Sequence, residues 1–177
     1  MSACVAVGAM VVGSMTHLRY QAVLVQDLGT HGLWRQAHVR PIARLVTTAE
    51  LLAAIVGVTV LVRNASPAQN RLTFLFIGTL FCAFSVYAFM LAHRTPGVPC
   101  GCSALQVPSS GWVLARAVGL AMLSLAAVIW PDHVITVANL EGEVALSVAG
   151  AACLGMVWWT LPSAMARVDL PARAVDG

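Results

Sequence analysis

Long apolar stretches separated by short polar ones dominate the chain and predict membrane-spanning helices. A helix needs about 20 mostly apolar residues to cross the hydrocarbon of a bilayer, and several stretches approach that length. The expected spans are residues 1–25, 42–62, 72–92, 112–130 and 144–161. The pattern therefore predicts an all-α fold, a polytopic membrane bundle of four to five transmembrane helices that forms a single domain over residues 1–177.

Polar and turn-forming residues mark the expected helix ends. Residues 63–67 read Arg-Asn-Ala-Ser-Pro, a cluster that stops a helix and places an arginine at the lipid headgroups. Trp112 and Trp130 flank the fourth span, as interfacial aromatic anchors do. Residues 26–41 turn polar and predict an extramembrane loop that contains an interfacial helix around Trp34.

The composition supports the same class of protein. Hydrophobic residues make up 59% of the chain and charged residues only 10%, against about 25% charged residues in a soluble domain. We expect an integral, multi-pass protein of a bacterial cell membrane whose main partner is the lipid bilayer. The predicted spans and their connections account for the 177 residues, so we expect no separate soluble catalytic domain.

All ten basic side chains are arginines, because the sequence contains no lysine, and they lie almost wholly between the apolar stretches. This distribution indicates membrane topology rather than nucleic-acid binding. Five spans would put five arginines on the same face as the loop that holds Cys100 and Cys102, and only Arg63 and Arg71 on the opposite face. The positive-inside rule turns that face to the cytosol, whereas disulfide chemistry favours the oxidising side, and both orientations stay open.

Cys100 and Cys102 form the sharpest local motif of the chain. They flank Gly101 in a polar interval between the third and fourth spans, and a glycine lets the backbone bend to close so small a ring. A disulfide between cysteines one residue apart is strained and therefore labile, which suits thiol exchange with another protein. The alternatives are a metal site, for which no histidine has convincing ligand spacing, and two incidental loop cysteines.

Three ionisable residues lie within or beside the apolar stretches. Glu50 is about two turns inside the second span, where a carboxylate faces either a cavity, as a proton relay, or a structural partner. Arg116, about one turn into the fourth span, either pairs with Glu50 or lowers the pKa of a loop thiol by its positive charge. His17 interrupts the first span and is expected to mark a helix end at the interface rather than an embedded proton acceptor.

Several chemistries leave no trace in the sequence. There is no haem-attachment motif, no glycine-rich phosphate loop and no metalloprotease histidine pair. Aromatic and polar residues form no constellation specific for a quinone, so no cofactor and no metal ion are predicted.

The order of these features resembles the methylamine-utilisation MauE family, which is related to DoxX-type redox-associated membrane proteins. The resemblance rests on Glu50 within Thr-Ala-Glu-Leu-Leu, on Pro99-Cys100-Gly101-Cys102, and on Arg116. It implies an accessory membrane protein that helps a thioredoxin-like partner form or rearrange disulfides in an exported client. In the namesake case that client is a methylamine dehydrogenase subunit.

We therefore expect a thiol–disulfide redox role, and with it a thiol-disulfide oxidoreductase activity, with Cys100 and Cys102 as the exchanging thiols and with Glu50 and Arg116 shaping the site. Two alternatives come from other classes of protein. One is a scaffold subunit without catalysis, in which the cysteines are structural. The other is a DoxX-like subunit of a quinone-coupled oxidoreductase.

Overall fold

The computed structural model describes residues 2–63, 65–94, 111–134, 150 and 155. Its elements are α1 (Ser2–Arg19), α2 (Gln21–Thr30), α3 (Gln36–Val62), α4 (Pro67–Arg94), α5 (Gly111–Ile129) and a single 3₁₀ turn, η1 (Pro131–His133). Every regular element in these ranges is helical, which confirms the all-α prediction. Cys100, Cys102 and, apart from positions 150 and 155, the predicted span 144–161 lie outside the described residues.

The described part contains three helices long and apolar enough to cross a membrane, namely α3, α4 and α5. Large apolar side chains point outward from all three, for example Leu45, Leu72 and Met122, each at least 60% exposed. Large apolar side chains exposed along several long helices are typical of a surface that contacts lipid or another protein. The chain is therefore a multi-pass membrane protein, with three candidate spans among the described residues instead of the predicted four to five.

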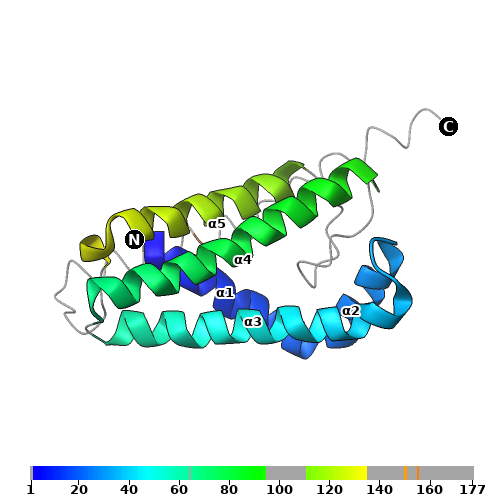
Figure 1. Ribbon diagram of the computed structural model, residues 1–177, viewed down its shortest axis with the longest axis horizontal. Coiled ribbons are helices and arrows are strands. Elements are labelled where there is room, and N and C mark those ends of the chain that lie inside the picture. The colour runs from blue at the N-terminus through cyan, green and yellow to red at the C-terminus, as the bar shows by residue number, and fades with distance from the viewer. Residues whose placement is uncertain (1, 64, 95–110, 135–149, 151–154, 156–177) are drawn as a thin grey trace.

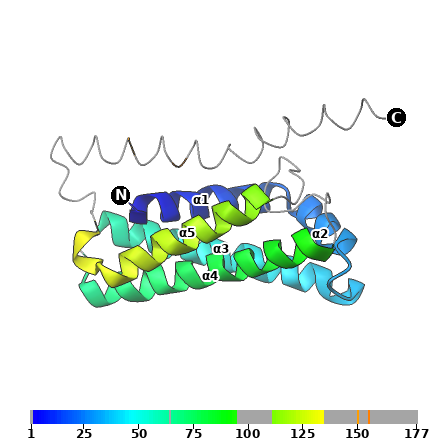
Figure 2. The same ribbon diagram turned by 90° about the horizontal axis from the view of Figure 1, so that it is seen from above.

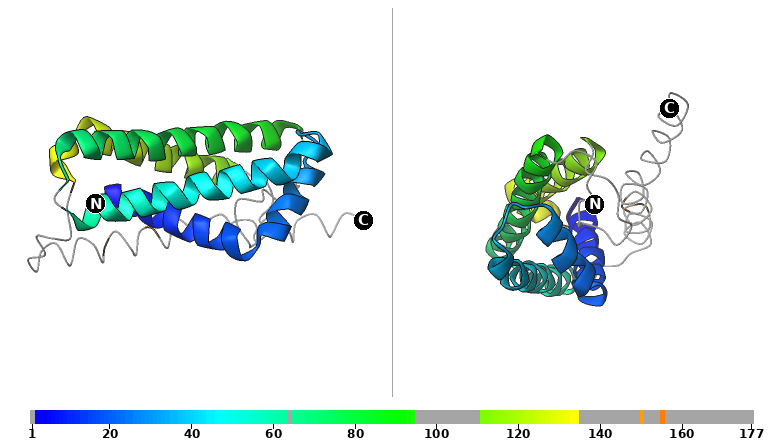
Figure 3. Two further views of the ribbon diagram at one scale, coloured as in Figure 1. Left: turned by 60° about the horizontal axis from the view of Figure 1, so that its bottom comes forward. Right: turned by 90° about the vertical axis from the view of Figure 1, so that its right-hand side faces the viewer.

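The four long helices run lengthwise and alternate in direction, while α2 lies across one end of the bundle (Figure 1; Figure 3). We call the end that carries α2 the α2 end. α1 and α4 finish there, and α3 and α5 begin there (Figure 2). The predicted cysteine loop connects α4 to α5, so both of its anchor points, Arg94 and Gly111, belong to the α2 end.

The first predicted span, residues 1–25, is two helices in the structure. The backbone of Tyr20 leaves helical geometry (φ −120°, ψ 39°), and α2 starts afresh at Gln21. The physical reason is that the apolar pattern stops at Arg19 and Tyr20, whose side chains are both exposed. α2 then buries Leu24 and Leu28 against the first turns of α3.

The interfacial helix predicted around Trp34 is wrong in position. The helix in this region is α2, which ends at Thr30, and residues 31–35 form the connection to α3. Gly32 adopts a left-handed backbone (φ +64°) that glycine accepts without strain, and this ends the helical run before Trp34. α3 begins at Gln36, six residues before the predicted start at Ile42, and it carries Pro41 in its second turn.

Small residues bring the helices into close contact at the end opposite α2. A Cβ atom added to Gly57 of α3 would lie only 2.8 Å from Val7 Cγ2 of α1. A Cβ added to Gly78 of α4 would lie 3.3 Å from the Cβ of Ser124 on α5. Glycine therefore permits both helix pairs to approach closely, as is common in membrane bundles.

Candidate functional site

Three ionisable side chains lie on the buried faces of three different helices. The buried residues of α1 recur with helical spacing from Ala3 to His17, and those of α5 from Val113 through Arg116 to Ala127. The buried face of α3 contains Glu50 in the same way. Helical periodicity thus turns His17, Glu50 and Arg116 into the interior of the bundle, where each is at most 8% exposed.

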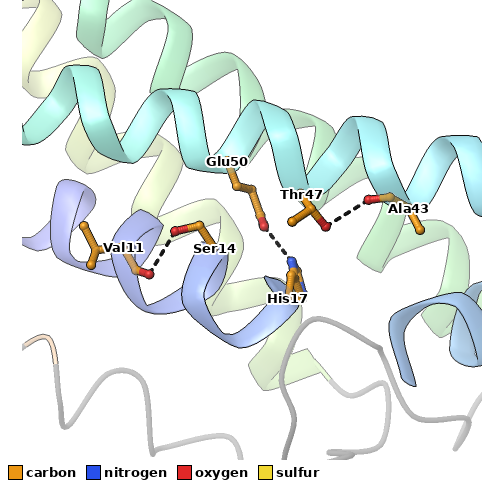
Figure 4. Close-up of polar contacts among 6 residues, drawn as sticks. All are labelled: Val11, Ser14, His17, Ala43, Thr47 and Glu50. Atoms are coloured by element: carbon orange, nitrogen blue, oxygen red, sulfur yellow. Dashed lines mark hydrogen bonds and ion pairs between the residues drawn. The ribbon is translucent and has the colours of Figure 1, made fainter. Parts of the chain in front are cut away.

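His17 of α1 and Glu50 of α3 form a buried, hydrogen-bonded pair. Nδ1 of His17 lies 2.5 Å from Oε2 of Glu50 (Figure 4). A carboxylate in an apolar bundle needs such a partner, because an unpaired charge there is costly. An imidazole and a carboxylate in direct contact can also take up and release a proton.

The neighbouring hydroxyls on the same two helices hydrogen-bond within their own helix. The hydroxyl of Thr47, one turn before Glu50, donates to the Ala43 carbonyl of its own helix at 2.9 Å (Figure 4). The Ser14 hydroxyl on α1 likewise donates to the Val11 carbonyl at 3.0 Å. Gly13 faces Glu50, because a Cβ added there would lie 3.7 Å from Oε1 of that residue.

This arrangement corrects the sequence-based interpretation of His17. Although it lies two residues before the end of α1, its side chain is only 6% exposed and packs inside the bundle rather than at an interface. The structure pairs Glu50 with His17, a partner that the sequence analysis did not name. The predicted pairing of Arg116 with Glu50 stays a prediction. The other prediction for Arg116, its effect on a loop thiol, stays a prediction.

A cavity of about 260 Å³ connects these residues. All five helices line it, and nearly all of its wall is apolar, including Phe81 and Phe84. The ionisable exceptions are His17, Glu50 and Arg116, together with the phenol of Tyr87. Because Val113 and Arg116 belong to the first turns of α5, the cavity lies in the part of the bundle nearer the α2 end.

Glu50 lies near the middle of α3. It is 14 residues after the start of the helix at Gln36, which at 1.5 Å per residue places it about 21 Å along the helix. The predicted two turns were counted from Ile42, six residues after the observed start of α3. Arg116 is five residues, or about 8 Å, from the start of α5.

A second polar cluster, which the sequence analysis missed, lies beside the cavity. His31, just after α2, is buried and its ring hydrogen-bonds the hydroxyl of Tyr87 on α4. Asp27, one turn earlier, is also buried, and its Oδ2 has no hydrogen-bond partner among the described residues. Burial raises the pKa of Asp27 above its ordinary value, and the nearby His31 opposes that shift. The missed signal was the helical spacing of Leu24, Asp27 and Leu28, which continues from the predicted span 1–25 into the segment interpreted as a loop.

The structure thus brings together two of the four predicted site residues. Glu50 and Arg116 line one cavity, and His17 joins them. Cys100 and Cys102 lie outside the described residues, although Arg94 and Gly111 on either side of their loop belong to the α2 end. The described residues include no group of three or more His, Cys, Asp or Glu side chains placed to hold a metal ion.

Comparison with known proteins gives one match. A family model described as methylamine utilisation protein MauE matches residues 1–131. That range covers α1 to α5 and includes the Pro-Cys-Gly-Cys motif, Glu50 and Arg116. Neither the curated proteins nor the solved structures gave a match.

Proposed function

Because the chain belongs to the MauE family, we propose that it is a membrane thiol–disulfide redox accessory protein of the bacterial cell membrane. In this proposal it supports disulfide formation or maturation of an exported client together with a thioredoxin-like partner. Cys100 and Cys102 are the exchanging thiols. Glu50 and His17 handle the protons, and Arg116 supplies positive charge.

The observation that carries the proposal is the cavity lined by His17, Glu50 and Arg116. Three ionisable groups from three helices are costly in a membrane bundle, and such groups usually belong to functional sites. The chain that enters and leaves this end carries two cysteines one residue apart. A proton acceptor and a cation promote thiol exchange when they lie close to a dithiol, since the thiolate is the reactive form.

The exchange step moves a disulfide between two proteins without net change in the number of electrons. One loop thiolate attacks a disulfide of the partner, which gives a mixed disulfide and releases one partner thiolate. The second loop thiol loses its proton and displaces the remaining partner sulfur. The partner is left as a dithiol and the loop as a disulfide, and the reverse sequence delivers a disulfide to the partner.

Trapping of the mixed disulfide tests this proposal. A Cys102→Ser variant cannot resolve the intermediate, so we expect a covalent adduct that reductant dissolves and that a Cys100→Ser, Cys102→Ser double variant does not form. Cys4→Ser is the matched control, because Cys4 lies near the start of α1, away from the α2 end. Absence of any reducible adduct would reject the proposal, and activity that survives loss of both loop cysteines would favour the scaffold class instead.

The role of Arg116 has its own test. Alkylation of the loop thiols at graded pH measures their pKa in the native protein and in Arg116→Ala. We expect the pKa to rise in the variant, because a nearby cation stabilises the thiolate, and to return in Arg116→Lys, which keeps the charge. Identical titration curves in all three proteins would exclude this role.

A further inference from the structure

We propose that the cavity between the helices is a binding site for a quinone, which accepts the electrons of the loop dithiol. The inference rests on the proposed thiol–disulfide function for its electron source. Its evidence, however, comes from described residues: the size and lining of the cavity, the His17–Glu50 pair in its wall and its exposed rim. The sequence alone showed none of these, because the lining comes from separate helices.

The size and lining of the cavity select the class of ligand. At about 260 Å³ it falls just below the range of roughly 300–1,000 Å³ that holds drug-sized molecules, so it suits one substituted ring and the start of a chain. Aromatic side chains of α4, Phe81, Phe84 and Tyr87, contribute to its wall. Flat rings stack favourably against such side chains.

The polar part of the wall is suited to a carbonyl oxygen. The His17–Glu50 pair holds an exchangeable proton in an otherwise apolar surrounding, and Arg116 adds a donor that keeps its charge. A few placed polar groups in an apolar pocket are typical of ligand sites that fix orientation. A hydrocarbon chain accepts neither a hydrogen bond nor a proton, whereas a quinone oxygen accepts a hydrogen bond before reduction and a proton during it.

Access to the cavity is available from the outer surface of the bundle. Ala83 lines the cavity and is exposed on α4, and Trp34, which is 45% exposed, lines it from the connection before α3. In a spanning helix an exposed position in the middle faces lipid. A ligand dissolved in the hydrocarbon of the membrane can therefore reach the cavity without crossing water.

The reaction balances without a further reactant. The two loop thiols lose two electrons and two protons as their sulfurs join in a disulfide. The quinone gains two electrons and two protons and leaves as a quinol. One proton is carried to a quinone oxygen by the His17–Glu50 pair, which is reprotonated from a departing thiol proton. The loop disulfide is then ready for delivery to the partner.

Titration of the purified full chain in detergent with ubiquinone-1 tests the site. Quinones quench tryptophan fluorescence, and Trp34 in the wall serves as reporter, with Trp34→Phe as the protein that lacks it. We expect saturable quenching in the native chain. Ala117→Phe, which fills the cavity from α5, should weaken binding by about tenfold or more, equivalent to about 1.4 kcal/mol. The matched control Ala115→Phe is exposed and outside the cavity lining, and it should bind like the native chain.

A second pair of variants keeps the test decisive if Ala117→Phe does not fold. Ala83→Phe closes the exposed rim of the cavity, and Val86→Phe, 59% exposed on the same helix, is its control. Equal affinity in the rim variant and its control would overturn the site. So would displacement of the quinone by 1-decanol at equal concentration, because an alcohol without a ring would then fill the cavity as well.

The outcomes separate this inference from the proposed function. Absence of saturable quinone binding, with the Cys102→Ser adduct still formed, overturns the quinone site and leaves the exchange proposal intact. Saturable binding that Ala117→Phe removes supports the site even where no adduct forms, and the exchange proposal alone then fails. Binding together with quinol formation that requires both loop cysteines supports both.

Discussion

The two ends of the bundle differ in how their interiors are built. At the end opposite α2, which we call the packed end and define by Val7, Gly57, Ile77 and Ala127, apolar side chains and helix backbones meet closely. The polar side chains buried toward this end, such as Asn70, Thr73 and Ser124, are uncharged. Toward the α2 end the same helices enclose the cavity and turn His17, Glu50 and Arg116 into it. The packed end stabilises the bundle through close contacts. The α2 end has fewer such contacts, because it encloses a cavity with ionisable side chains.

The difference shows how a small membrane protein carries a costly site. Each buried ionisable group weakens the bundle unless it is paired, and a cavity forgoes van der Waals contacts. Close contact of α1 with α3 at the packed end holds the two helices that carry His17 and Glu50. The comparison predicts that variants at the two ends have separable effects.

The largest effect is expected from Glu50→Gln. The amide keeps the shape and an oxygen that accepts from His17, but it does not take up a proton, so thiol–disulfide exchange should slow by about a hundredfold, within the range of general acid–base catalysis. Quenched alkylation of the loop thiols over time measures the rate. Ser124→Ala, a buried hydroxyl change on α5, should leave the rate unchanged. Equal rates in all three proteins would remove Glu50 from the mechanism.

Gly57→Leu should produce the opposite result at the packed end. Its side chain would collide with Val7, and overpacking of this kind costs about 1–3 kcal/mol of stability. Thermal unfolding in detergent measures the loss, and we expect the exchange rate per folded molecule to stay near the native value. Gly8→Leu is the control, since a Cβ at Gly8 meets no atom within 4 Å. An unchanged melting temperature in Gly57→Leu would contradict the close contact.

Tyr87→Phe should have a smaller effect. It removes the hydroxyl that hydrogen-bonds His31 and links α4 to the end of α2, and one such bond contributes about 0.5–1.5 kcal/mol. The same unfolding measurement applies, with exposed Tyr20→Phe as the control. If Tyr20→Phe lost as much stability as Tyr87→Phe, the hydrogen bond between Tyr87 and His31 would not be the cause of the loss.

The smallest effect is expected from Asp27→Asn, and it concerns pH. Burial raises the pKa of Asp27 in the folded chain above the value of about 3.8 that applies to the unfolded chain. Between these two values the folded state binds more protons, so stability falls as pH rises through that window. Unfolding measured at graded pH should show a shallower fall in Asp27→Asn, with exposed Asp132→Asn as the control. A fall that is unchanged in the variant would assign the pH dependence to another group.

Prediction from sequence succeeded where a property belongs to one helix. Span 112–130 agrees with α5 to within a residue at each end, because α5 begins with Gly111 and Trp112 and Pro131 follows its end. It failed at residues 1–25 and around Trp34, where the chain turns through Tyr20 and Gly32. Apolar content continues across the first turn, so composition did not reveal the change of direction.

The helical periodicity of α1 already indicated that His17 is buried. His17 falls on the same helical face as Met10 and Ser14, which marks it as buried, yet its position near the helix end favoured the interface. The pairing of His17 with Glu50 could not be read in this way. It joins residues 33 positions apart, and only the relative rotation and translation of α1 and α3 decide which side chains meet.

The sequence by itself determined the helical class, the membrane environment and the cost of Glu50 and Arg116 inside apolar segments, because these depend on hydropathy and on local backbone preferences. Only the tertiary structure decided that His17 is the partner of Glu50 and that Arg116 shares their cavity. Those facts depend on how close glycine lets the helices approach and on which faces they turn toward one another. Side chains from separate helices create the site, and their distances are fixed by packing rather than by spacing along the chain.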